Sequence, residues 1–288
     1  MGMTIATHVA PDWDAICSVW LLKRYQPGFA DADVVFVNTG SPDPAVLESA
    51  AAVVDTGRAW DVTTHRYDHH QFPGAMANER CAAKLVYDTL RGFGYIDGVL
   101  EPLINLINAG DTGKKEANES RMLGIHALLS NKKRQGADSY SLLAYGFDIL
   151  DNLAQSLISQ DDALKSLVMH TVYRSEDGLV VALKDAPQGA TWAAHDAGVR
   201  LVVFADYRRN AIGVMRGGEG ADVDCGALVG WIVDDPTAPT DLGSELDTWF
   251  RHPAGFVALR GSDKAPRDDA ILVSLRDVAA ALDAAWRR

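Results

Sequence analysis

Two clusters of histidine and aspartate are the residues of this chain best suited to metal chemistry. Asp68, His69 and His70 are consecutive, and a second cluster near the N-terminus holds His8 and Asp12, with Asp14 close behind. Burying such groups together is unfavourable unless something binds them. Neutral imidazole and carboxylate together suit divalent Mn, Fe, Co or Zn. The sequence therefore predicts a divalent-metal site to which both clusters contribute.

Two further carboxylates complete the ligand set. Asp55 ends a short apolar run over 51–55, and Asp111 lies at a glycine break in an apolar helical stretch over 103–113. The predicted ligands are His8, Asp12, Asp14, Asp55, His69 and Asp111. Six ligands suffice for two ions if one carboxylate bridges, and two ions about 3.5–4 Å apart activate a water for phosphoryl displacement. We expect Mn²⁺, with Fe, Co and Zn as alternatives.

Some of these residues also have simpler explanations. Asp12 alone would serve as a helix N-cap, and Asp111 alone would cap the segment that follows it. His70 is left with two roles: contact with a phosphate oxygen or leaving group, or a hydrogen bond that supports a metal ligand.

The elements around the clusters place them at one edge of a sheet. Residues 3–7 and 51–55 read as buried strands, and 14–25 has the apolar spacing of a helix. His8 and Asp55 would then follow the C-terminal ends of two strands, where open α/β sheets bind their ligands. We expect an α/β fold with a parallel sheet.

The ordered motifs resemble those of the DHH phosphoesterase superfamily, which includes RecJ-type exonucleases and nanoRNases. They are His8-x-x-Pro-Asp12-x-Asp14, then Asp55, then 68–70, then Gly-Asp111-Thr-Gly. The surroundings of 68–70 look closer to the melanocyte-proliferating-gene exonuclease family, whereas the first motif has the DHH form.

The resemblance implies a role for each residue. His8, Asp12 and Asp55 would hold one metal ion. The second ion would be held by Asp14, Asp55, His69 and Asp111, so that Asp55 bridges. As catalytic residues, Asp68 would orient His69 and His70 would face the phosphate.

The C-terminal part predicts a second domain. A long helical pattern over 138–169 ends before β-rich runs at 179–183, 200–204 and 211–215, and a final helix covers 275–286. We expect a catalytic domain with a connecting helix over 1–173, a smaller mixed α/β domain over 174–288, and a substrate cleft between them.

The segment 249–256 of the second domain resembles the substrate-binding element that follows DHH domains. It would grip the substrate through His252 and the Gly255 backbone, with Arg251 and Arg260 as further candidates. A strand-entry turn with solvated side chains explains the same residues equally well.

Composition limits the class of protein. The three cysteines are widely spaced, which favours reduced thiols in a cytoplasm, and no apolar run is long enough to span a membrane. A net charge of −12 counts against broad duplex binding but is compatible with a nucleotide or a short single-stranded oligonucleotide. The basic run 132–134 reads as a solvated loop, with a nucleic-acid contact as the alternative. A homodimer is left open.

These observations predict a metal-dependent phosphohydrolase acting on a nucleotide or short oligonucleotide. Two alternatives stay open: a small-molecule phosphatase acting on a nucleoside bisphosphate or pyrophosphate, and a non-catalytic relative that binds nucleotide.

Overall fold

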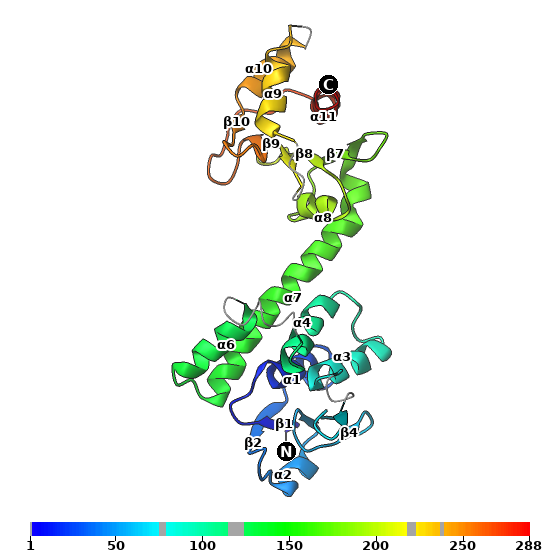
Figure 1. The fold of residues 1–288 in the computed structure, drawn as a ribbon, viewed down its shortest axis with the longest axis vertical. Helices are drawn as coiled ribbons and strands as arrows, with labels where there is room; N and C mark the ends of the chain where they lie inside the picture. The colour runs from blue at the N-terminus through cyan, green and yellow to red at the C-terminus, as the bar shows by residue number, and fades with distance from the viewer. Residues whose placement is uncertain (1, 75–78, 115–123, 218–222, 237–238) are drawn as a thin grey trace. The chain divides into compact units, whose positions relative to one another are not determined.

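The protein forms two compact units, Met1–Leu157 and Ile158–Arg288, in a computed structural model that describes residues 2–74, 79–114, 124–217, 223–236 and 239–288. The division falls inside α7 (Ser139–His170), a single continuous helix (Figure 1). The sequence pattern predicted this helix within a residue at each end and placed the domain boundary after it, at 173.

The first unit contains a five-stranded sheet and the helices that cover it. Its strands are β1 (Thr4–His8), β2 (Asp33–Val37), β3 (Ala52–Val54), β4 (Trp60–Asp61) and β5 (Arg66–Tyr67). Its helices are α1 (Trp13–Tyr25), α2 (Pro44–Ser49), α3 (Ala82–Gly92), α4 (Glu101–Asp111), α6 (Ile125–Arg134) and the first part of α7.

The strand order in this sheet is β2-β1-β3-β5-β4, and all neighbours pair in parallel except β4, the antiparallel edge. The chain leaves β1 for β2 on one side and returns to β3 on the other. The C-terminal ends of β1 and β3 therefore lie beside a switch point in strand order, where such sheets place their binding sites.

Alternating side chains divide the core of this unit between two faces. Ile5 and Val54 belong to the large cluster that includes α1, α3 and α4. Ala6 and Val53 point the other way, into a small cluster with Leu47 of α2. The strands are apolar on both faces because helices cover both, as expected for a parallel sheet.

The second unit is a mixed α/β structure. Its strands are β6 (Thr171–Arg174), β7 (Val180–Lys184), β8 (Leu201–Asp206), β9 (Ala211–Arg216), β10 (Phe250–Arg251) and β11 (Val257–Arg260). Its helices are α8 (Ala190–Asp196), α9 (Cys225–Val233), α10 (Thr240–Asp247) and α11 (Leu275–Trp286). The order is β10-β11-β9-β8-β7-β6, with only β7 and β8 parallel. The predicted α/β class is confirmed in both units.

The described residues also bear on two expectations from composition. Cys17, Cys81 and Cys225 are free and buried. None of the described helices combines the length and apolar character that a bilayer span requires.

Candidate metal centre

The structure brings all six predicted ligands together in the first unit. His8 is the last residue of β1, and Asp55 directly follows β3. Asp12 caps the N-terminus of α1, Asp14 lies in its first turn, and Asp111 is the last residue of α4. The side chains form three groups suited to a metal ion, which overlap at Asp55 and His69: His8–Asp12–Asp55, Asp14–His69–Asp111 and Asp55–His69–His70.

Asp55 belongs to two of these groups and presents a different oxygen to each. Its Oδ2 is 3.1 Å from His8 Nε2, and its Oδ1 is 3.7 Å from His69 Nε2. The side chain is buried, and Oδ1 has no hydrogen-bond partner. The backbone of Asp55 adopts a left-handed φ of 52°, a conformation that aspartate tolerates better than most residues and that concentrates at functional sites.

The tautomer of His8 suits metal binding. Its Nδ1 lies 2.8 Å from the Val9 carbonyl, which can only accept, so Nδ1 carries the proton and neutral His8 offers its Nε2 lone pair. Asp12 Oδ1 is 3.8 Å from the same Nε2. Burial by itself lowers the pKa of His8, but the contacts with Asp12 and Asp55 raise it to about 10. The metal-free site therefore holds a proton that a metal ion would displace.

Asp14 has a structural partner as well as a place in the second group. Its carboxylate accepts from the backbone N–H groups of Ala82 and Ala83, at 2.8 and 2.6 Å, at the start of α3. Burial, and then the charges of Asp55 and Asp111, raise its pKa well above the ordinary range.

The remaining members of the second group meet at His69. His69 Nε2 is 3.7 Å from Asp14 Oδ2 and 3.4 Å from Asp111 Oδ2. Burial raises the pKa of Asp111 to about 6, with further contributions from the charges of Asp12 and Asp55. Carboxylates whose charges oppose one another in this way are stabilised by a cation placed among them.

The donor set fits divalent metal ions. Four carboxylates and two imidazoles converge, the ligand chemistry of Mn, Fe, Co or Zn. The unsatisfied Oδ1 of Asp55 and the raised pKa values of three of the carboxylates are costs that a bound cation offsets.

Asp68 orients His70, whereas the prediction paired it with His69. Asp68 Oδ1 is 2.7 Å from His70 Nδ1 and also accepts from the His70 backbone N–H, while Oδ2 accepts from Arg58 N. The contact is local, because a carboxylate readily accepts the N–H two residues on in a turn. The hydrogen bond with Asp68 raises the pKa of His70.

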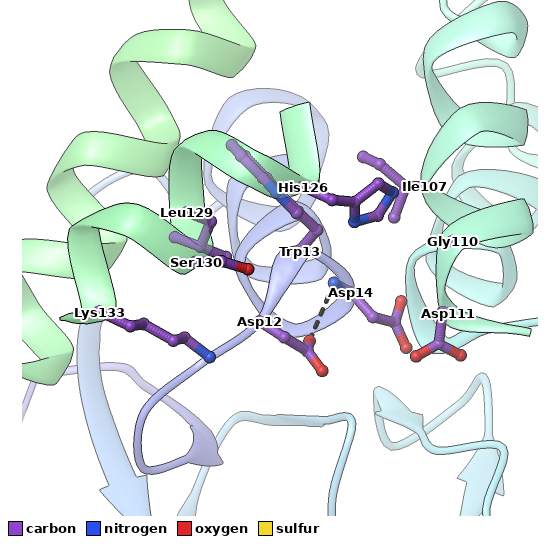
Figure 2. Close-up of a pocket in the computed structure, with 10 residues that line it drawn as sticks. All are labelled: Asp12, Trp13, Asp14, Ile107, Gly110, Asp111, His126, Leu129, Ser130 and Lys133. Carbon is purple, nitrogen blue, oxygen red and sulfur yellow. Dashed lines mark hydrogen bonds between the residues drawn. The ribbon is translucent and has the colours of Figure 1, made fainter. Parts of the chain in front are cut away.

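A pocket of about 310 Å³ opens beside the ligands. Figure 2 shows Asp12, Asp14 and Asp111 facing side chains from α6, among them His126, Ser130 and Lys133. Lys133 donates from Nζ to the Ala10 carbonyl at 2.8 Å. The run 132–134 is thus the last turn of a helix and not a loop.

Sequence reasoning missed two residues that shape this centre. Asn108 is buried in α4, where it accepts from Cys81 N and donates to the Glu79 carbonyl, holding the chain just before α3. It lies one helical turn before Asp111 and therefore projects from the same face of α4, and this spacing is the signal by which the sequence could have indicated it. His126 packs so tightly over Gly110 that a Cβ there would meet His126 Cε1 at 2.1 Å.

The predicted substrate-binding residues lie in the second unit, around β10 and β11. His252 stacks against Phe256 with ring centroids 4.3 Å apart, and Gly255 has a φ of +68° beside Asp224. Arg251 Nη2 is 4.0 Å from Asp247 Oδ1. Arg260 is buried, and its guanidinium pairs with Glu245 at 3.1 Å and with Asp269. These ion pairs explain Arg260 structurally, and substrate contact by the four residues stays a prediction.

A family model supports part of this interpretation. The model MYG1_exonuc, described as an uncharacterised protein family (UPF0160), matches residues 4–91, a segment that holds every predicted ligand except Asp111. It agrees with the resemblance around 68–70 and supports a nuclease or phosphoesterase kind of function. No curated protein matches the sequence.

Several solved structures are similar to this chain. RecJ in complex with Mn²⁺ from Thermus thermophilus matches at 13% identity and a TM-score of 0.32, over 99% of this chain and 51% of that one. The DHH domain of a member of the s1p family of ribosomal proteins matches at 13% identity and a TM-score of 0.27, over 89% and 82%. The chain spans about half the length of the RecJ chain.

Proposed function

We propose that this protein is a metal-dependent phosphohydrolase that cleaves a phosphoester of a nucleotide or a short single-stranded oligonucleotide. Two divalent ions, with Mn²⁺ as the first candidate, would be held by His8, Asp12 and Asp55 on one side and by Asp14, His69 and Asp111 on the other. When bound, such a pair supplies an acidified water and neutralises charge on the phosphate.

The observation that carries the proposal is the position of Asp55. Its two oxygens face separate groups of ligands, as a carboxylate shared by two ions must. A structural carboxylate would satisfy both oxygens with hydrogen bonds, yet Oδ1 is buried without one.

The other residues of the centre prepare the reaction. Asp68 holds His70 through Nδ1, which leaves Nε2 as the ring atom able to meet a phosphate oxygen or to deliver a proton to the leaving group. Asp14 and Asn108 fasten the start of α3 to α1 and α4, and so keep the ligand-bearing elements in place.

The test is a panel of substrates assayed side by side with Mn²⁺: a 5′-labelled dinucleotide, adenosine 3′,5′-bisphosphate and pyrophosphate. We expect turnover of at least one nucleotide, its loss on chelation, and its recovery when Mn²⁺ is returned. Turnover of pyrophosphate alone would identify a pyrophosphatase instead. Metal binding without turnover of any of the three would leave the non-catalytic alternative.

A further inference from the structure

The pocket beside the ligands offers a site that the metal centre does not use. We define the α6 pocket by Ser130 and Lys133 on α6, with apolar walls from Trp13, Ile107 and Leu129. In Figure 2 the Lys133 side chain extends toward Asp12, and the Ser130 hydroxyl turns into the same space. A group attached to a metal-bound phosphate would therefore have room, apolar walls and polar donors next to it.

Lys133 is held in position by one hydrogen bond and has further N–H donors that a ligand could use. One N–H of its ammonium group donates to the Ala10 carbonyl, in the loop between His8 and Asp12. An ammonium group has three donors, so two remain for a ligand. The neighbouring Lys132 makes a different contact: its Nζ lies over the ring of Tyr145, 5.3 Å from the ring centre.

The charge balance of the pocket selects the ligand. Without metal, Asp12, Asp14 and Asp111 outweigh Lys133 and would repel an anion. Two divalent ions would offset the four carboxylates of the candidate centre, which leaves a positive charge at Lys133, the lysine among the residues that line the pocket.

We propose that the α6 pocket binds a second phosphate of the substrate, with Lys133 Nζ and Ser130 Oγ as its contacts. This inference rests on the proposed phosphohydrolase function, and it names a specificity-determining residue for it. The substrate would then be a nucleotide that carries a phosphate besides the one attacked.

The test compares a dinucleotide ending in hydroxyls with the same dinucleotide bearing a 5′- or a 3′-phosphate. We expect the parent protein to prefer one phosphorylated form, and Lys133→Ala to raise the KM of that form about 10- to 100-fold, the value of a hydrogen bond to a charged group. The KM of the unphosphorylated dinucleotide should change by less than about two-fold. This substrate lacks the phosphate that Lys133 would contact, and a charged side chain exposed to solvent contributes little to binding. Lys132→Ala is the matched control and should behave as the parent.

Three results would overturn the inference: no preference in the parent, an equal effect of Lys133→Ala on all substrates, or weaker Mn²⁺ binding in that variant. The last would show that Lys133 serves only to brace the Ala10 loop.

If the parent turns over neither the dinucleotides nor adenosine 3′,5′-bisphosphate, the proposed function fails, and the pocket is then tested by ligand binding alone. Calorimetry with the Mn²⁺-loaded protein would compare adenosine 3′,5′-bisphosphate with adenosine 5′-monophosphate. Tighter binding of the bisphosphate that disappears in Lys133→Ala supports the pocket, and equal affinities of the parent for both refute it.

Discussion

Asp55 Oδ2 lies 3.1 Å from His8 Nε2, and this contact joins the ends of two adjacent parallel strands. His8 ends β1 and Asp55 follows β3, so the register of the sheet sets their separation before any ligand is bound. A site whose spacing is fixed by a sheet is preorganised, which reduces the cost of assembling it around a metal ion.

Asp55→Asn should remove the ligand that the two proposed ions share. An amide keeps the size of the side chain and its left-handed backbone but loses the charge and one acceptor. We expect Mn²⁺ stoichiometry to fall from two to one or none, measured by calorimetry or metal analysis of the purified protein. Asp61→Asn is the control, because Asp61 is exposed, lies outside the candidate ligands, and hydrogen-bonds through its side chain to Thr63 and Thr64 in its own turn. Two ions retained in Asp55→Asn would contradict the bridging role.

His69→Ala should impair metal binding, whereas His70→Ala should impair turnover. His69 lies among Asp14, Asp55 and Asp111, so its loss should abolish one ion. His70 is held by Asp68, and its loss should lower kcat by about 10²- to 10⁴-fold, the range for a proton-transfer group, with both ions kept. Metal titration of both variants measures the number of bound ions, and steady-state kinetics of both measures kcat. A loss of metal in the His70 variant would make it a ligand.

The metal-free protein should become less stable as Asp111 ionises. Its folded pKa of about 6 lies above the unfolded value of 3.8, so the folded state binds the proton more tightly and stability falls as pH rises from 3.8 through 6. Asp111→Asn lacks this group. The melting temperature of Asp111→Asn relative to the parent should therefore increase between pH 4 and pH 7 in the presence of chelator.

Scanning calorimetry across that range provides the measurement. With Mn²⁺ the order should reverse, because the parent gains more from the metal than a variant that lacks a ligand. A difference that does not depend on pH would show that Asp111 has an ordinary pKa.

Gly110→Ala should destabilise the protein although alanine usually favours a helix. The new Cβ would lie 2.1 Å from His126 Cε1, and overpacking of this kind costs about 1–3 kcal/mol. At Gly92 of α3 no atom lies within 4 Å of the equivalent Cβ, so Gly92→Ala should be neutral or stabilising by up to about 1 kcal/mol.

Chemical denaturation of four proteins measures this relationship: the parent, the two alanine variants and Gly110→Ala with His126→Ala. The double variant should recover much of the loss, because the clash involves one ring. Equal destabilisation at Gly92 and Gly110 would exclude the ring as the cause.

The convergence of the candidate ligands could be expected because several of them follow local patterns. His8 and Asp55 end apolar runs that read as strands, and parallel strands bring their C-terminal ends to one edge. Asp12 and Asp14 begin a helix with clear apolar spacing. Such signals lie within a few residues of the chemistry and do not require knowledge of the tertiary fold.

The supporting contacts could not be predicted, because they join segments far apart in the sequence. Asp14 meets the start of α3, His126 covers Gly110, and Lys133 reaches Ala10. A lone histidine or lysine in a helix has no periodic signature that identifies its partner. The hydrogen bond between Asp68 and His70 depends on the conformation of the turn after β5, which residue types alone do not specify.

The backbone of Ala10 is fastened at both of its polar atoms. Its N–H donates to Ser139 Oγ, and its carbonyl accepts from Lys133. Ser139 is the first residue of α7, the helix in which one compact unit gives way to the other. The loop that carries His8 and Asp12 is thus hydrogen-bonded to the first residue of α7, and α7 also contacts α1 through Asp151, which accepts from Trp20 and Arg24. A change in the position of α7 would therefore act on both ends of the segment that carries Asp12 and Asp14.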